Sequence, residues 1–235
     1  KKLHELRRLE IEQHSQIPLF LLNKVLFPRQ EITLQIFEPR YREMLEFCIE
    51  DSVPFGVVSI EAGEEVGGGA IPRSVGTTAN IQQVLPISND RFLVSACGAK
   101  RFQIESDIEE IPYPTAQVAF SLPDDDTAVK GTGDPELLTP EIWKQYLTLG
   151  KLRDRVIGAW QPSPNNPLTE HRFCDSVGAY TEGYASDLLR QDLLSTYEAK
   201  DRIPVANSIL NQAIHKLSRQ LRLLDATRIG GIHQN

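Results

Sequence analysis

Cysteines and long apolar runs are both scarce in this sequence, and each absence excludes a class of protein. The 235 residues contain three cysteines, Cys48, Cys97 and Cys174, and no Cys-x-x-Cys pair. An odd and widely spaced set argues against a disulfide scaffold and against structural zinc, and it fits a reducing compartment. No apolar run approaches about 20 residues, so we expect no membrane span. The charged N-terminus also lacks the apolar core of a secretory signal.

An excess of basic residues is missing as well. The chain has 25 Lys and Arg against 32 Asp and Glu, a formal net charge of −7. A general nucleic-acid-binding protein carries a basic face, and an anionic membrane surface attracts positive charge. We therefore expect neither nucleic acid nor membrane as a partner. The hydrophobic share of 40% is ordinary for a globular protein with one large domain or two small ones.

The residues from Ile17 to Glu50 predict a strand, a loop, a second strand and a helix. Ile17–Leu22 is a short apolar run that is typical of a buried strand. Glu31–Phe37 alternates between apolar and polar residues, which predicts a strand with one buried face. Pro39 suits the first position of a helix. The apolar face expected for this helix comprises Tyr41, Leu45, Cys48 and Ile49.

Further strands are predicted up to residue 122. Tight turns join segments that are rich in β-branched and aromatic residues, and Gly98 indicates a bulge or a close approach of two backbones. The expected strands are Phe55–Ile60, Val75–Pro86, Arg91–Ala99 with its continuation Arg101–Ser106, and Thr115–Leu122. Six or more strands with one short helix predict a closed or nearly closed β-barrel.

The second half of the chain changes to a helical period. Residues 123–138 are rich in Asp, Gly and Pro and predict an acidic linker. Thr139-Pro140 predicts a helix start, and further helices are expected at Thr169–Tyr184, Ser186–Ser195 and about Asp201–Asp225. The fold class is therefore α+β. We expect an extension (1–16), a barrel (17–122), the linker (123–138) and a helical subdomain (139–235).

Two stretches of the predicted barrel resemble the amino-terminal, substrate-binding domain of Lon-type ATP-dependent proteases. The first stretch matches the family pattern at Pro18, Leu19, Val25, Phe27, Pro28, Leu34, Ile36, Phe37, Arg40, Tyr41 and Leu45. The second matches at Gly76, Thr77, Ala79, Ile81, Val84, Asp90, Arg91, Phe92, Gly98, Arg101, Phe102 and Ile104. A looser match in the helical half covers Leu193-Leu194, Asp201-Arg202-Ile203 and Ile209-Leu210.

The resemblance implies a PUA-like β-barrel followed by a helical subdomain, and a module that binds polypeptides. The 235 residues carry neither the ATPase nor the protease module of the family, so the chain resembles stand-alone members and is expected to have no enzymatic activity. No cofactor is implied. Such members occur in bacteria and in plastids, which implies the bacterial cytoplasm or the plastid stroma. The expected partner is an unfolded polypeptide or a protease, with a role as an adaptor in protein quality control.

Three clusters contain residue types that are found in reactive or ligand-binding sites, but each is better explained by a structural role. The glycine-rich loop at residues 61–72 lacks the lysine of a phosphate-binding loop, and its Glu64 and Glu65 would repel phosphate. Asp124, Asp125 and Asp126 are adjacent, without the spacing of a calcium loop. His171 and Cys174 are three residues apart and can share a helical face, but buried cysteines commonly act as small apolar residues. We expect no metal site and no catalytic residue.

Four residues are candidates for a partner surface: Phe27, Phe37, Tyr41 and Arg101. The three aromatic residues lie near the start of the barrel, where exposed aromatics would mark a binding site, and their alternative role is core packing. Arg101 can recognise a ligand or bond to carbonyl groups and acids within the fold.

Two other functions stay open. PUA-like barrels bind RNA in other families, and a crevice between barrel and helices can hold a small regulatory ligand. The sequence does not determine the oligomeric state. The apolar stripe of the last helix can pack inside the chain or against a second subunit.

Overall fold

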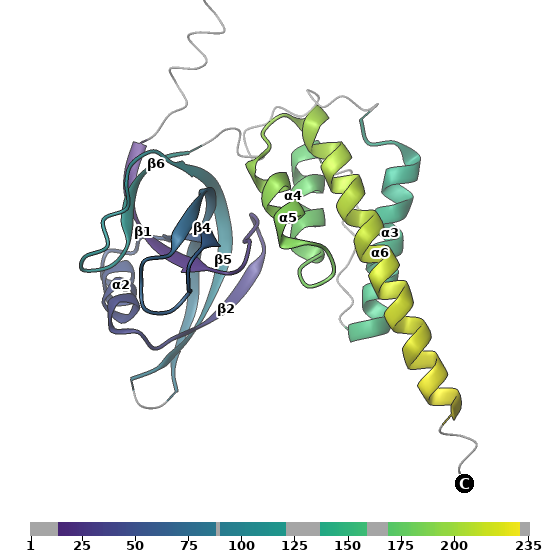
Figure 1. The fold of residues 1–235 in the computed structure, drawn as a ribbon, viewed down its shortest axis with the longest axis horizontal. Helices are drawn as coiled ribbons and strands as arrows, with labels where there is room; N and C mark the ends of the chain where they lie inside the picture. The colour runs from purple at the N-terminus through teal and green to yellow at the C-terminus, as the bar shows by residue number, and fades with distance from the viewer. Residues whose placement is uncertain (1–13, 88–89, 121–136, 159–168, 231–235) are drawn as a thin grey trace, which may run out of the picture. The chain divides into compact units, whose positions relative to one another are not determined.

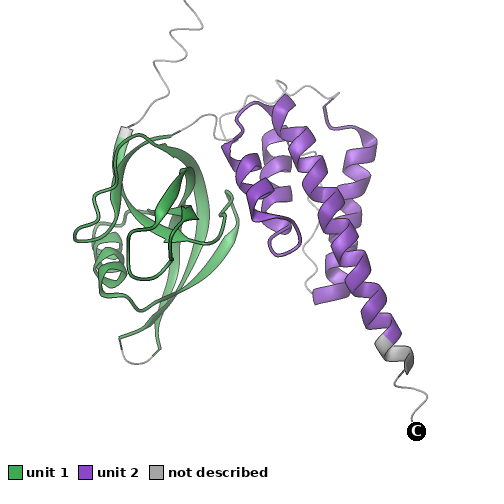
Figure 2. Cartoon of the chain, viewed as in Figure 1, with its two compact units in different colours: residues 1–127 green, residues 128–235 purple. Residues whose placement is uncertain are grey.

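The computed structural model describes residues 14–87, 90–120, 137–158 and 169–230 (Figure 1). The chain divides into two compact units, residues 1–127 and 128–235 (Figure 2). Residues 1–13 of the predicted extension and 123–136 of the predicted linker lie outside the described residues, as does the Asp124–Asp126 cluster.

The first unit is built on a six-stranded sheet. Its strands are β1 (His14–Leu22), β2 (Glu31–Ile36), β3 (Phe55–Ala62), β4 (Ile71–Pro86), β5 (Phe92–Ile104) and β6 (Thr115–Phe120). They follow the order β2-β5-β4-β3-β1-β6, and an additional β5–β6 pairing joins five of them in a closed ring, with β2 outside it (Figure 1). Only the β1–β3 pair is parallel among these strands. With the helices described below, the predicted α+β class is confirmed.

Two strand edges are left without a strand partner in the described part of this unit. β2 pairs with β5 along its whole length, from Glu31 opposite Cys97 to Ile36 opposite Phe92, and with no other described strand. β1 changes partner along its length. His14–Pro18 pairs with β6, whereas Leu19–Leu22 pairs with β3 alone. The outer side of β2 is therefore an open edge, and so is β1 beyond Leu19, whose N–H still donates to the Pro114 carbonyl at 2.7 Å.

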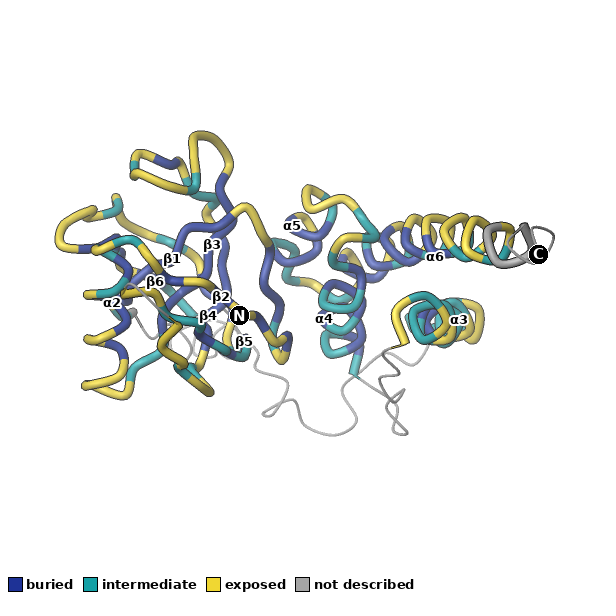
Figure 3. Tube along the Cα trace, turned by 90° about the horizontal axis from the view of Figure 1, so that it is seen from below, coloured by how far each residue is buried: buried dark blue, intermediate teal, exposed yellow. Residues whose placement is uncertain are grey.

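The alternation predicted for β2 is confirmed. Its residues alternate between exposed and buried from Glu31 to Ile36, which places one face against the core (Figure 3). Helix α2 (Pro39–Glu50) begins with a proline in its first turn, as expected. Its buried residues are Tyr41, Met44, Leu45 and Cys48. Ile49, predicted to be buried, is 49% exposed, because it lies at the edge of a stripe that follows i, i+3, i+4 and i+7.

The bulge predicted near Gly98 is confirmed. The residues predicted as two segments form one strand, β5, and a register shift lies between the pairs Ala79–Gly98 and Thr77–Arg101. Gly98 also meets the 27–30 loop, because its N–H donates to the Gln30 carbonyl at 2.8 Å. The same glycine thus meets both expectations, a bulge and a close backbone approach.

The second unit contains four described helices: α3 (Pro140–Ile157), α4 (Glu170–Tyr180), α5 (Asp187–Ser195) and α6 (Ala199–Gly230). The side chains of Thr139 and Thr169 cap α3 and α4 by accepting hydrogen bonds from backbone N–H groups. α4 ends at Tyr180 rather than at Tyr184, because the Thr181 hydroxyl bonds back to the Val177 carbonyl and the backbone leaves the helical conformation.

Aromatic rings and a long apolar stripe form the core of this unit. The Tyr146 ring lies 5.3 Å from that of Phe173 and 5.5 Å from that of Trp143. The stripe predicted for α6 is buried or, at Ile214, half-buried as far as Leu217, and burial decreases towards the end of the helix, where Leu224 is exposed (Figure 3). None of the described helices combines the length and the apolar character that crossing a membrane requires.

Candidate functional site

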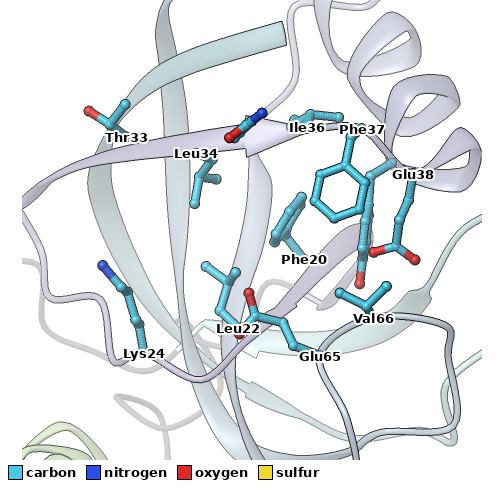
Figure 4. A pocket seen from close by; sticks show the side chains of 12 residues that line it. Phe20, Leu22, Lys24, Thr33, Leu34, Ile36, Phe37, Glu38, Glu65 and Val66 are labelled. Carbon is cyan, nitrogen blue, oxygen red and sulfur yellow. The ribbon is translucent and has the colours of Figure 1, made fainter. Parts of the chain in front are cut away.

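A groove of about 260 Å³ lies in the first unit between the two open strand edges (Figure 4). Strands β1 and β2, the start of α2 and the loop between β3 and β4 contribute its walls. The lining residues are Phe20, Leu22, Lys24, Thr33, Leu34, Gln35, Ile36, Phe37, Glu38, Tyr41, Glu65 and Val66. The groove combines an apolar floor with a charged rim and with backbone that has no strand partner.

Tyr41 belongs to the floor of the groove, and several contacts fix its side chain. Its ring stacks on that of Phe20 with centroids 4.1 Å apart, and the Arg40 guanidinium lies 4.5 Å from the ring centre. The Tyr41 hydroxyl accepts a hydrogen bond from the Leu21 N–H at 3.4 Å, which gives one edge group of β1 a side-chain partner. Burial raises the pKa of Tyr41 above its ordinary value, so the phenol stays neutral.

The rim of the groove is held by two carboxylates. Glu65 accepts a hydrogen bond from the Asn23 N–H at 3.1 Å, and Glu38 accepts one from the Gly67 N–H at 3.2 Å. Glu38 also pairs with Arg40 at 3.2 Å. The two hydrogen bonds to backbone N–H groups attach the β3–β4 loop to the rest of the unit on either side of Val66. The exposed Val66 side chain therefore has a defined position at the groove.

The structure brings two of the four predicted site residues into this groove and not the other two. Phe37 lines it and is 46% exposed. Tyr41 lines it but is buried, so its role is to shape the floor. Phe27 is fully buried, and Arg101 is buried in β5 opposite Thr77. Neither Phe27 nor Arg101 offers an exposed side chain to a partner, and their burial favours the alternative roles, core packing and support of the fold.

The sequence patterns pointed to two of the twelve lining residues and missed the other ten, among them Phe20, Leu22, Glu65 and Val66. Phe20 and Leu22 belong to a run predicted as a buried strand, and both are indeed buried. Their contribution depends on β1 losing its β6 neighbour halfway along, which no local pattern reveals. Val66 had one signal, because it is an isolated apolar residue within a glycine-rich loop.

The described lining of the groove combines apolar side chains with the polar groups of Lys24, Thr33, Gln35, Glu38 and Glu65. This described lining contains no histidine, serine or cysteine to act as a base or nucleophile. Among the described residues, no group of three or more His, Cys, Asp and Glu side chains is arranged to hold a metal ion. The volume lies below the roughly 300 to 1,000 Å³ that is usual for pockets of small molecules and cofactors.

The residues around His171 and Cys174 form a buried polar network in the second unit. Arg202 is fully buried and pairs with the Asp175 carboxylate. Its guanidinium also lies 3.2 Å from Nδ1 of His171 and donates to the Leu193 carbonyl. Cys174 is fully buried beside this network. Because His171 and Asp175 both engage Arg202, they join helix α4 to α6, which is a structural role.

Comparisons with known proteins agree with this architecture. The family model of the ATP-dependent protease La (Lon) substrate-binding domain matches residues 16–212. The Lon protease of Anaeromyxobacter dehalogenans (strain 2CP-C) and Lon protease 2 of Myxococcus xanthus are each 25% identical over 214 residues, which cover 86% of this chain and 24% of the relative. The chain thus spans about a quarter of the length of these relatives.

Solved structures share the fold. A Lon N-terminal domain protein from Xanthomonas campestris has a TM-score of 0.54 at 23% identity, over 81% of this chain and 95% of that one. The N-terminal domain of Mycobacterium avium complex Lon protease has a TM-score of 0.59 at 16% identity, over 84% and 98%. Since the family model covers most of the sequence, the chain belongs to the family of the ATP-dependent protease La (Lon) substrate-binding domain.

Proposed function

We propose that this chain is a non-catalytic module that binds unfolded polypeptides through the groove beside β2. As the family description names a substrate-binding domain and the relatives are named Lon proteases, the polypeptides would be proteins destined for proteolysis. The chain would act as an adaptor that presents them.

One observation carries the proposal. Phe37 and Val66 are 46% and 55% exposed, and they border an apolar floor made by buried side chains such as Phe20 and Leu22. Exposed apolar residues that gather at a hollow mark binding sites, because covering them with another apolar group removes their surface from water. Burying a phenylalanine side chain fully contributes about 1.5–3 kcal/mol. An unfolded polypeptide is a partner that carries accessible apolar side chains.

The proposal also explains why the groove needs no reactive group. A binding module acts by affinity alone, and the lining supplies apolar area and hydrogen-bonding groups. The net charge of −7 disfavours RNA as the occupant, since phosphate binding depends on basic side chains.

Fluorescence anisotropy tests this function with a defined probe. Reduced, carbamidomethylated α-lactalbumin, which stays unfolded and whose capped cysteines are neutral, is labelled with fluorescein and titrated with the chain. We expect saturable binding that the native, unmodified protein does not show, and an unchanged probe mass after incubation. Binding of the native form to an equal extent, or cleavage of the probe, would contradict the proposal.

A further inference from the structure

We infer that the groove takes an extended polypeptide segment as an added strand on the open edge of β2. The segment places one apolar side chain between Phe37 and Val66 and a basic residue beside Glu65 and Glu38. This inference rests on the proposed function and specifies the mode of binding and the chemistry of the bound segment.

The strand edges supply the first argument. Strand β2 contributes four consecutive lining residues, Thr33–Ile36, and its outer edge has no partner among the described strands. An edge strand presents alternate N–H and C=O groups that pair readily with another extended chain. Facing it, β1 has no β6 partner over Leu19–Leu22, but the Leu19 N–H donates to the Pro114 carbonyl at 2.7 Å and the Leu21 N–H donates to the Tyr41 hydroxyl at 3.4 Å. The backbone N–H and C=O groups that are available to pair with an added strand are therefore those of β2.

The shape of the site agrees with a strand as the occupant. The groove follows β2 from Lys24 and Thr33 at one end to Phe37 and Val66 at the other (Figure 4). A strand that pairs with an edge turns alternate side chains to the same face. A volume of about 260 Å³ holds one or two of these side chains, while the rest of the segment continues along the edge.

Charge complementarity specifies the sequence of the segment. The charged lining residues are Lys24, Glu38 and Glu65, and the two carboxylates lie near Val66 (Figure 4). Arg40 pairs with Glu38, whereas the contact described for Glu65 is with a backbone N–H. The Val66 end of the groove is therefore negative, and the chain as a whole carries −7. A Lys or Arg beside the apolar residue is favoured there, and an acidic residue is repelled.

Backbone N-methylation of a peptide distinguishes an added strand from apolar adhesion. The probe is a fluorescein-labelled peptide of ten residues, Ser and Thr throughout except for a central Leu and a Lys two positions after it, so that both side chains share one face of the strand. Two derivatives carry N-methyl groups on alternate central amides, one on the even positions and one on the odd. A strand pairs through one of these sets only. We expect about a ten-fold loss of affinity for one derivative, equivalent to two lost hydrogen bonds, and little loss for the other.

The preference for a basic residue is tested by changing one charge on the peptide and one on the chain. Replacing the Lys of the probe by Glu is expected to weaken binding about two- to five-fold, as for a partly exposed ion pair. Glu65→Gln keeps an oxygen that accepts from the Asn23 N–H but removes the charge, so it should reduce this preference. Equal affinity of the Lys and Glu probes for the unchanged chain would overturn the charge assignment.

Two variants of the chain test whether the peptide binds in the groove. Phe37→Ser should abolish most of the binding, whereas Ile49→Ser, at a position of similar exposure on α2 outside the groove, should not. Equal losses for the two N-methylated derivatives, or no binding of any peptide at about 1 mM, would overturn the added strand. If unfolded α-lactalbumin still binds in that case, the proposed function stands and only this mode of binding fails.

Discussion

Gly98 and Phe27 are packed so closely that a Cβ atom added to Gly98 would overlap the carbonyl oxygen of Phe27. The backbones are joined on either side of this contact, because the Arg29 N–H donates to the Gly98 carbonyl at 2.7 Å and the Gly98 N–H donates to the Gln30 carbonyl at 2.8 Å. The contact attaches the chain between β1 and β2 to the sheet, and so it sets where β2 begins.

Gly98→Ala is therefore expected to lower the free energy of unfolding by about 3 kcal/mol, at the upper end of what overpacking costs. The obstructing atoms belong to the backbone and cannot rotate away. Urea denaturation measures the change. Ser95→Ala at a half-buried position of the same strand is the control and should stay within about 0.5 kcal/mol of the unchanged chain. Similar values for the two variants would show that the contact is loose.

Cys48 is expected to make stability depend on pH in the alkaline range. Burial raises the pKa of this thiol from 9.0 to about 12. Above pH 9 the unfolded chain loses the proton while the folded chain keeps it, so the unfolded state gains free energy of ionisation and stability falls as pH rises. The contribution of the protonated Cys48 thiol to the free energy of unfolding is complete below pH 9 and is lost between pH 9 and 12.

The comparison of Cys48→Ala with the unchanged chain isolates this effect. The variant loses packing, so it should be less stable at pH 8. The difference should then shrink by up to about 1.4 kcal/mol per pH unit above pH 9, because only the unchanged chain carries the thiol. Urea denaturation at pH 8, 9 and 10 provides the values. A difference that stays constant over this range would mean that the folded thiol ionises normally.

The Asp175–Arg202 pair is expected to be essential for the helical unit. Asp175→Ala leaves a fully buried guanidinium without its carboxylate and should cost about 3–5 kcal/mol. Adding Arg202→Met should recover part of this loss, since it removes the uncompensated charge. Asp225→Ala breaks the exposed pair with Arg155 and should change stability by less than about 1 kcal/mol. A double variant less stable than Asp175→Ala would argue against this account.

Glu38 is expected to control the order of the β3–β4 loop without supporting the fold as a whole. Glu38→Ala removes the acceptor of the Gly67 N–H and the partner of Arg40. Amide hydrogen exchange at Gly67 should become faster, while the free energy of unfolding changes by about 1 kcal/mol or less. Glu46→Ala, at an exposed acid of α2, should leave the exchange unchanged. Unaltered exchange in Glu38→Ala would show that other contacts hold the loop.

Local patterns predicted the elements better than the site. The alternation of β2 and the proline in the first turn of α2 are properties of a few neighbouring residues, and both predictions are confirmed. The groove instead depends on where β1 changes partner and on a loop about 40 residues further along the chain. The burial of Arg202 could not be predicted from local patterns either, because it depends on hydrogen-bond partners that lie on α4 and α5.

Chemical-shift mapping of the full chain by NMR tests the central claim most directly. The ¹⁵N-labelled chain is titrated with unlabelled, reduced and carbamidomethylated α-lactalbumin. Binding in the groove predicts that perturbed amides cluster at residues 20–24, 33–41 and 65–67, and that Phe37→Ser removes the perturbations while Ile49→Ser retains them. Perturbations confined to the helical unit, or an unaltered spectrum, would contradict the assignment of the groove as the polypeptide-binding site.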